Sequence, residues 1–203
     1  VNDYLKSFMD AHKDGYKALS PGNIKRNIPH KDSNEVINDL PFGWILKYYD
    51  ETDVYAMKAD ILRYELLYFY GGVYIDCDFL CLKNIEELIS PYIGFSGYES
   101  TEYIAIGLMG FCKYDKILFN IIKELPYNII NNKSYTIPEL TGPIFFTNIW
   151  NKYILSNNYH VFDQKYFYSY TFNNKINNIE YNINDSNNDN YAIHMWGHSW
   201  KSE

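Results

Sequence analysis

A predicted helix that ends on two glycines and passes straight into a β-rich segment constrains the fold of this chain most strongly. Residues 53–70 carry one apolar stripe at helical spacing, made of Ala59, Leu62, Leu66 and Phe69, with Asp53 as the expected N-cap. Gly71 and Gly72 end this helix, because glycine adopts the left-handed cap without strain. Residues 73–80 then predict a strand, since they are rich in β-formers.

Helices and strands alternate along the rest of the chain. We expect further helices over 3–19, 85–89, 116–123 (ending near Pro126) and 144–155, strands over 92–95 and 105–111, strand or loop over 161–170, and loops over 20–43 and 173–190. This alternation predicts an α/β layered fold. Neither a repeat nor a convincing domain boundary is visible, so we expect residues 1–203 to form a single domain.

Charge and cysteine content exclude several function classes. The net charge of −7 argues against a duplex nucleic-acid binder and disfavours a membrane-surface role. No stretch approaches 18 consecutive apolar residues, so we expect no membrane span in this chain. No charged-then-apolar leader is visible from Val1 on, but the missing Met suggests a trimmed start, so a removed leader or anchor is the alternative. Three cysteines without regular spacing do not describe a disulfide framework, which favours a reducing, cytoplasmic setting. Cys77 and Cys81 lack a second pair, so no zinc site is expected.

Two aspartates stand one residue apart in the predicted strand 73–80. Because side chains alternate across a strand, Asp76 and Asp78 are expected to point to the same side. Like charges this close raise each other's pKa, and a divalent cation, which prefers oxygen ligands, relieves that cost. The alternative is that the strand has already ended and that both carboxylates lie in solvent.

The predicted helix before this pair carries Asp60 and Arg63, which lie three residues apart and hence on neighbouring surface. One interpretation is a surface ion pair, which contributes little to stability. The other is that helix and strand place a carboxylate, a guanidinium and a metal-binding pair around one cleft. Ligands of open α/β sheets bind outside the carboxyl ends of strands, where Asp76 and Asp78 are expected.

The segment ADILRYELLYFYGGVYIDCDFLCLKNI (59–85) resembles the DXD segment of glycosyltransferase family 32, the group that contains the yeast initiating α-1,6-mannosyltransferase. It is also similar to the glucosylating domain of the large clostridial toxins. These enzymes share (S/A)-D-x-x-R-Y, then a helix, then G-G-x-Y-x-D-x-D. The matching residues here are Ala59, Asp60, Arg63, Tyr64, Gly71, Gly72, Tyr74, Asp76 and Asp78.

The resemblance implies a GT-A type fold, that is, a Rossmann-like mixed sheet flanked by helices. It implies a nucleotide-sugar donor, with a UDP-sugar favoured, and Mn²⁺ or Mg²⁺ held through Asp78, with Asp76 near the ribose or sugar. The resemblance likewise implies that Asp60 and Arg63 hydrogen-bond the donor sugar and that Tyr74 belongs to the substrate site.

Two later segments extend the resemblance. Thr141-Gly142-Pro143 resembles a family loop near the active site, which assigns Gly142 and Pro143 to substrate binding. The ending AIHMWGHSW (192–200) resembles the terminal H-x-W…S-W of the family. There His194 or Ser199 completes the metal and diphosphate site, and Trp200 covers the nucleotide or sugar. A packed, hydrogen-bonded His194 is the alternative, and His198 is expected to be structural or exposed.

The chain departs from the family at two places. No apolar strand of I-P-K-I-I-H-x-I-W type precedes Asp60, so the expected domain lacks part of the N-terminal nucleotide-binding strand. An Asn frequent after the DXD is replaced by Ala105-Ile106-Gly107.

The resemblance leads us to expect a metal-dependent, retaining glycosyltransferase that moves a hexose to a glycan or protein acceptor. No carboxylate stands out as a covalent nucleophile, so we favour front-face attack, with the diphosphate taking the acceptor proton. A solvated loop is favoured for Glu99 and Glu102, with a position facing the acceptor as the alternative. The Tyr-rich stretch 166–172 is expected in either an acceptor groove or the core.

Two other functions compete with this one. The first is a phosphatase of the haloacid-dehalogenase type, whose first motif is also an apolar strand ending in DxD. The second is a non-catalytic sugar-binding domain on the same fold.

Overall fold

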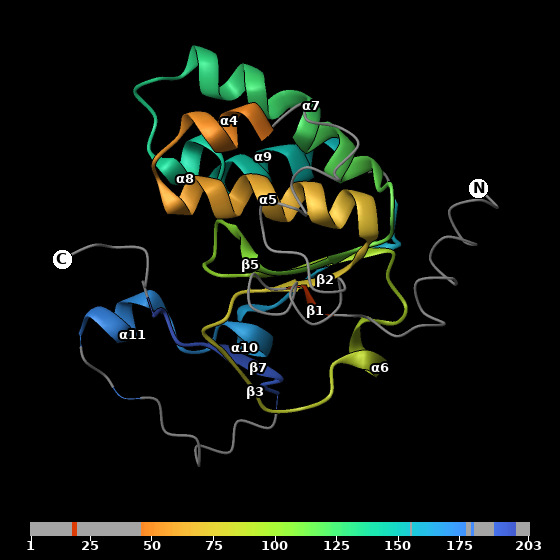
Figure 1. Cartoon of the computed structure of the whole chain (residues 1–203). Coiled ribbons are helices and arrows are strands. Elements are labelled where there is room, and N and C mark those ends of the chain that lie inside the picture. Colours follow the sequence, from red (N-terminus) through yellow and green to blue (C-terminus); the bar gives the residue numbers. More distant parts are fainter. Residues whose placement is uncertain (1–17, 20–45, 155, 178–179, 181–188, 198–203) are drawn as a thin grey trace, which may run out of the picture.

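The computed structural model describes residues 18–19, 46–154, 156–177, 180 and 189–197. Figure 1 shows a central sheet with a layer of helices on one face and a smaller layer on the other. Most of the predicted helix 3–19 and the whole predicted loop 20–43 lie outside the described residues. Residues 18–19, expected at the end of that helix, form a strand instead.

The main sheet is mixed, with strand order β1-β2-β5-β4-β6. Its strands are β1 (Ala18–Leu19), β2 (Gly72–Ile75), β4 (Gly94–Tyr98), β5 (Ile104–Phe111) and β6 (Tyr159–Phe162). The outer pairs β1–β2 and β4–β6 are parallel, and the inner pairs β2–β5 and β4–β5 are antiparallel. The predicted α/β class, with a mixed sheet flanked by helices, is confirmed.

Among the described residues, five helices cover one face of the sheet, and they lie above it in Figure 1. They are α4 (Leu46–Glu51), α5 (Tyr55–Tyr70), α7 (Lys116–Asn131), α8 (Ile137–Leu140) and α9 (Pro143–Tyr153). The layer on the other side contains α6 (Glu86–Ile89), α10 (Gln164–Phe167), α11 (Phe172–Ile176) and a second sheet of β3 (Phe79–Cys81) with β7 (Ala192–His194).

Each face of the main sheet has its own hydrophobic core. The core under the five helices includes Ile61, Tyr64, Ile121, Phe146 and Trp150. The core on the opposite face includes Val73, Phe95, Leu108, Phe162 and Phe167. Apolar side chains project from both faces of the sheet and must be shielded from water on each side. This requirement explains why the sheet lies between two covering layers.

Helix α5 confirms the central prediction, with two corrections. It begins at Tyr55, its N-cap is Val54, and the predicted cap residue Asp53 is exposed. The single apolar stripe is also wrong, because α5 buries side chains on most of its circumference, Arg63 and Glu65 included. Sandwiched between α4, α7 and the sheet, it has little surface left for water.

The two glycines end α5 as predicted. Gly71 and Gly72 have φ angles of 64° and 98°, the region that glycine adopts without strain. A Cβ added to Gly71 would lie 2.7 Å from the backbone nitrogen of Lys113, so the close packing of the chain excludes a side chain here as well.

Three other boundaries differ from the predictions. Helix α7 continues through Pro126 to Asn131, because its buried face, which includes Ile121 and Leu125, packs firmly on the core. The stretch 161–170 contains the end of β6 and helix α10. Helix α11 begins the segment predicted as loop, where Thr171 caps its first turn.

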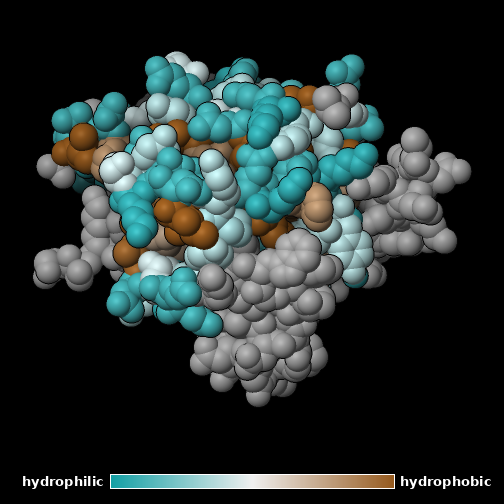
Figure 2. Space-filling view, turned by 90° about the horizontal axis from the view of Figure 1, so that it is seen from above, coloured by the Kyte–Doolittle hydropathy of each residue, from teal (hydrophilic) through white to brown (hydrophobic). Residues whose placement is uncertain are grey.

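The outer surface of the helical layer is predominantly hydrophilic. Figure 2 shows this face with only scattered hydrophobic patches. Within the described residues, no helix is both long and apolar enough to cross a bilayer.

Candidate active site

The DXD segment lies in a turn that joins the two sheets. Strand β2 ends at Ile75, and β3 begins at Phe79. The N–H of Phe79 donates to the carbonyl of Asp76 at 3.2 Å, which closes the turn. The single predicted strand 73–80 is therefore wrong, because the chain leaves the main sheet after Ile75 to pair elsewhere. Asp76 and Asp78 still come close together, but through the turn and not through strand alternation.

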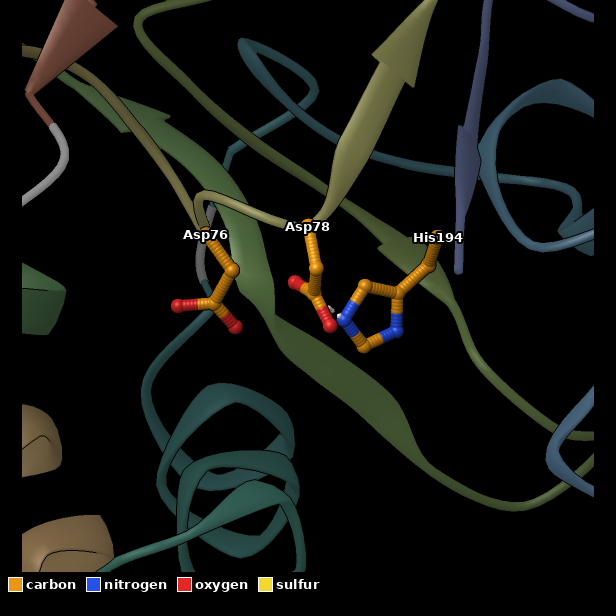
Figure 3. Close-up of side chains that lie close together, drawn as sticks. All are labelled: Asp76, Asp78 and His194. Carbon is orange, nitrogen blue, oxygen red and sulfur yellow. Dashed lines mark hydrogen bonds and ion pairs between the residues drawn. The ribbon is translucent and has the colours of Figure 1, made fainter. Parts of the chain in front are cut away.

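Strand β7 brings His194 to this turn. The antiparallel pairing of β3 with β7 places Phe79 opposite His194, and their rings stack at 4.7 Å. The N–H of Met195 donates to the carbonyl of Asp78, and His194 Nε2 lies 3.0 Å from Asp78 Oδ1. Residues 116 positions apart thus meet at one point of the fold. Figure 3 shows Asp76, Asp78 and His194 converging there.

These three side chains have the composition and spacing of a metal site. Their ligand atoms lie within 4.8 Å of one another. Carboxylate oxygens suit Mg²⁺ and Mn²⁺, and an imidazole nitrogen is a common transition-metal ligand. The predicted role of His194 in metal binding fits this geometry. The alternative of a packed residue also holds in part, because only 9% of the residue is exposed.

Asp78 is held in its charged form. Partial burial raises its pKa, but the hydrogen bond and charge of His194 and the N–H of Gly197, 2.7 Å from Oδ2, outweigh that effect. The net pKa is lowered to about 2. A carboxylate that stays ionised at every ordinary pH is a suitable cation ligand.

Asp76 is fixed by α5 and β2. The hydroxyl of Tyr74 donates to Asp76 Oδ1 at 2.7 Å, and Arg63 Nη2 lies 3.5 Å from the same oxygen. The Arg63 guanidinium lies over the Tyr74 ring, 4.5 Å from its centroid. Tyr74, predicted in the substrate site, is only 2% exposed. Its hydroxyl orients Asp76 through this hydrogen bond, and the residue also lines the pocket.

Asp60 and Arg63 are not a surface pair, since each is only 5% exposed. Arg63 Nη2 lies 3.3 Å from Asp60 Oδ1, and the Thr141 hydroxyl donates to Asp60 Oδ2 at 2.8 Å. Burial nevertheless dominates and raises the pKa of Asp60 to about 6, against the opposing effects of Arg63 and Thr141. The sequence interpretation of a surface ion pair is therefore excluded, because α5 packs against other helices and the sheet and buries both residues.

An irregularity in β5 supplies backbone partners for the same site. The register between β4 and β5 shifts between Ser96 and Tyr98. The carbonyl of Ile106 accepts from Arg63 Nη1 at 2.8 Å, and the carbonyl of Gly107 accepts from the N–H of Asp76 at 2.7 Å. Strand bulges of this kind commonly lie beside functional sites, where they redirect polar groups.

These groups surround one pocket of about 380 Å³. Its lining includes Asp60, Arg63, Tyr74, Asp76, Asp78 and His194, together with Gly142 and Pro143 as predicted from the TGP segment. Tyr55, Ala59, Ile137 and Pro138 give it an apolar side. A mostly apolar hollow with a few convergent charged groups is typical of a small-molecule site.

Glu99, Tyr168 and Trp196 also line the pocket, and the sequence favoured another place only for Glu99. Glu99 was expected in solvent, but its side chain lines the pocket, where burial and the nearby Asp60 raise its pKa to about 7. Tyr168 is 1% exposed, and Trp196 donates through Nε1 to the carbonyl of Tyr170 at 2.8 Å. Trp196 belongs to the H-x-W motif and Tyr168 to the Tyr-rich stretch 166–172, whereas no local sequence signal singles out Glu99, which reaches the pocket only through the tertiary packing.

Ser199, Trp200 and His198 lie outside the described residues. Their predicted roles therefore stay predictions. Trp196, four positions before Trp200, lines the pocket and packs against His194 with ring centroids 4.2 Å apart.

Comparison with known proteins agrees with these motifs. Residues 1–93 match the family model described as "glycosyltransferase sugar-binding region containing DXD motif". Inositol phosphoceramide mannosyltransferase 3 of Schizosaccharomyces pombe is 31% identical over 151 residues, which is 72% of this chain and 39% of that protein. An uncharacterized glycosyltransferase of Acanthamoeba polyphaga mimivirus is 28% identical over 116 residues, covering 55% of this chain and 45% of that one.

The chain thus spans less than half the length of these relatives. Among solved structures, the PaToxG glycosyltransferase aligns over 63% of this chain and 46% of its own, with 19% identity and a TM-score of 0.48. The resemblance drawn from residues 59–85 is confirmed by the family model. Residues 1–93 of this chain thus match the sugar-binding region that contains the DXD motif.

Proposed function

We propose that this chain is the donor-binding and catalytic part of a metal-dependent glycosyltransferase that moves a hexose from a nucleotide-sugar to an acceptor. The observation that carries the proposal is the convergence of Asp76, Asp78 and His194 within 4.8 Å at the edge of a pocket of about 380 Å³. The two aspartates are those of the DXD motif in the region that matches the family model.

A divalent ion held by these three residues would act as a Lewis acid on the diphosphate of the donor. Asp78 stays ionised to hold it, and the Gly197 N–H and His194 orient its two oxygens. Tyr74 and Arg63 fix Asp76.

Arg63 also keeps Asp60 and Asp76 apart while compensating both charges. Burial lowers its pKa, but Asp76, Tyr74 and Asp60 outweigh burial, so the net pKa is raised and the guanidinium stays charged. We propose that Asp60 accepts a hydrogen bond from a hydroxyl of the donor sugar, since correct placement of the sugar governs the rate of transfer.

Mannose is the first hexose to test, because the relative from Schizosaccharomyces pombe is named inositol phosphoceramide mannosyltransferase 3. This makes GDP-mannose the leading donor beside the UDP-sugars favoured by the sequence. The same name makes inositol phosphoceramide the first acceptor to test, beside glycans and glycoproteins.

The test is a panel of UDP-glucose, UDP-galactose, UDP-GlcNAc and GDP-mannose, with and without Mn²⁺ or Mg²⁺. We expect one donor to raise the melting temperature and to be hydrolysed slowly, only with metal. Asp78→Asn should abolish both effects, and Asp53→Asn, an exposed aspartate just before α5, should leave them intact.

Three results separate the competing functions. Metal-dependent donor binding without hydrolysis or transfer would indicate a sugar-binding domain. Hydrolysis of p-nitrophenyl phosphate that Asp76→Asn abolishes would indicate a phosphatase. No binding of any donor in the panel, with either metal, would contradict the proposal.

A further inference from the structure

Glu99 and Tyr168 line the pocket with polar groups for which the described residues provide no hydrogen-bond partner. The hydroxyl of Tyr168 is buried and has no hydrogen-bond partner among the described residues; the amide of Leu108 lies near it without meeting hydrogen-bond geometry. The Glu99 carboxylate likewise makes no hydrogen bond or ion pair within the described part of the chain. Buried polar groups without partners are rare in native proteins, so the Tyr168 hydroxyl calls for an explanation, and the half-buried Glu99 adds a second polar group to the same pocket.

Both residues are held rigidly, which argues against a chance arrangement. The N–H of Glu99 donates to the carbonyl of Tyr103, and the side chain of Gln164 donates to the carbonyl of Glu99 at 2.6 Å. Gln164 begins α10, and Tyr168 is the C-cap of that helix. One hydrogen bond therefore ties the loop that carries Glu99 to the helix that carries Tyr168.

The glycines of the sheet leave room for this arrangement. A Cβ on Gly97 would lie 2.9 Å from the Phe167 ring, so β4 approaches α10 closely only without a side chain there. A Cβ on Gly107 would lie 2.7 Å from Asp76 Oδ2 and 3.3 Å from the Tyr168 hydroxyl. The Tyr168 hydroxyl thus projects toward the same hollow as the DXD carboxylate.

We propose that Glu99 and Tyr168 form a hydroxyl-binding subsite that recognises a hexose. The inference rests on the proposed function and adds the two residues that would determine sugar specificity. A carboxylate accepts hydrogen bonds from sugar hydroxyls, and a phenol can donate or accept. The partly exposed ring of Trp196, whose centroid lies 6.1 Å from that of the Tyr168 ring, offers apolar surface for the sugar carbons.

A cationic ligand fits this subsite less well. Burial and Asp60 raise the pKa of Glu99 to about 7, so it is partly neutral near that pH and attracts a cation weakly. A neutral polyhydroxyl ligand satisfies both protonation states, because a carboxylic acid donates where a carboxylate accepts.

The hydroxyls belong either to the donor sugar or to the acceptor, and two assays distinguish these sources. The variants are Glu99→Gln, Glu99→Ala and Tyr168→Phe, with Glu102→Gln as control, because Glu102 is exposed in the same loop. The first assay compares the affinities of GDP-mannose and UDP-glucose with those of GDP and UDP, by calorimetry in Mn²⁺. The second measures transfer from the bound donor to inositol phosphoceramide in micelles.

Contact with the donor sugar predicts that Glu99→Ala weakens nucleotide-sugar binding about 10- to 100-fold and leaves nucleotide binding unchanged. Tyr168→Phe should weaken it about 2- to 10-fold. Contact with the acceptor predicts unchanged donor affinity and hydrolysis, with transfer reduced by similar factors.

If the three variants match Glu102→Gln in both assays, the subsite does not exist, while the proposed function stands. If the wild type binds no nucleotide-sugar, both proposals fail together. Melting temperatures check folding, and Tyr168→Phe keeps the test valid if Glu99→Ala is unstable, because it removes a single oxygen atom.

Discussion

Asp60→Asn is expected to stabilise this protein at neutral pH while impairing its activity. The carboxyl is buried, and its pKa is raised from the usual 3.8 to about 6, mainly by burial and against the opposing effects of Arg63 and Thr141. Asparagine keeps an oxygen that can accept from the Thr141 hydroxyl, which donates to Asp60 at 2.8 Å. The substitution also removes the free-energy cost of ionising a residue that is only 5% exposed.

The magnitude follows from proton linkage. A carboxyl whose pKa is higher in the folded than in the unfolded protein binds more protons when folded, so stability falls as pH rises from about 4 to about 6. A shift of roughly two units at 1.36 kcal/mol each corresponds to about 3 kcal/mol. The variant should match the wild type near pH 4 and exceed its free energy of unfolding by up to about 3 kcal/mol above pH 7.

Urea unfolding at pH 4, 5, 6 and 7, followed by circular dichroism, measures this difference. Equal m-values in the two proteins show that the unfolded states are comparable. Asp115, which titrates in the same range, is present in both proteins and cancels. Glu99 does not cancel, because Asp60 contributes to its raised pKa, so the two proteins are compared in a Glu99→Gln background. Asp53→Asn, at an exposed position, should show no such pH-dependent gain. An Asp60→Asn variant that is less stable than the wild type at pH 7 would refute the reasoning, because the Arg63 ion pair would then outweigh burial.

Three further substitutions test the packing around the site. In Gly107→Ala the added Cβ would lie 2.7 Å from Asp76 Oδ2, so Mn²⁺ binding in calorimetry should weaken. The free energy of unfolding should fall by at most about 3 kcal/mol. Unchanged Mn²⁺ affinity would contradict this. Gly71→Ala should lower the free energy of unfolding, measured in urea, by at least about 1 kcal/mol. The reason is that φ is 64° at this residue and that the added Cβ would lie 2.7 Å from Lys113 N. An unchanged free energy would show that the helix end relaxes. Asp115→Ala should lower the free energy of unfolding by about 1–2 kcal/mol, because it removes the N-cap of α7, which accepts from the N–H of Ile117 at 2.7 Å. A loss below about 0.5 kcal/mol would show that the cap is dispensable.

The sequence predicted the parts of the fold that depend on neighbours along the chain. Helix α5, its end at Gly71 and the start of β2 follow from periodicity and from the backbone freedom of glycine, both of which act over a few residues. The boundaries that were wrong have tertiary causes. Pro126 stays inside α7 because the buried face of that helix packs on the core. Strand β2 stops at Ile75 because the chain turns there so that Phe79–Cys81 can pair with β7.

The candidate site divides in the same way. Asp60, Arg63, Asp76 and Asp78 carry a recognisable motif, and the structure brings all four to one pocket. Glu99 carries no such signal. Its place in the pocket depends on the register shift in the β4–β5 pair and on the hydrogen bond from Gln164, neither of which the sequence around it reveals.

The sequence by itself determined which side chains could hold a cation, since two carboxylates one residue apart must be compensated wherever they lie close together. Tertiary structure decided the third member of the cluster and the protonation of the buried groups. His194 meets Asp78 across 116 residues only because β3 pairs with β7. The pKa values of Asp60 and Glu99 rise because the surrounding layers remove them from water, and burial of this kind is a property of the whole fold and not of any segment.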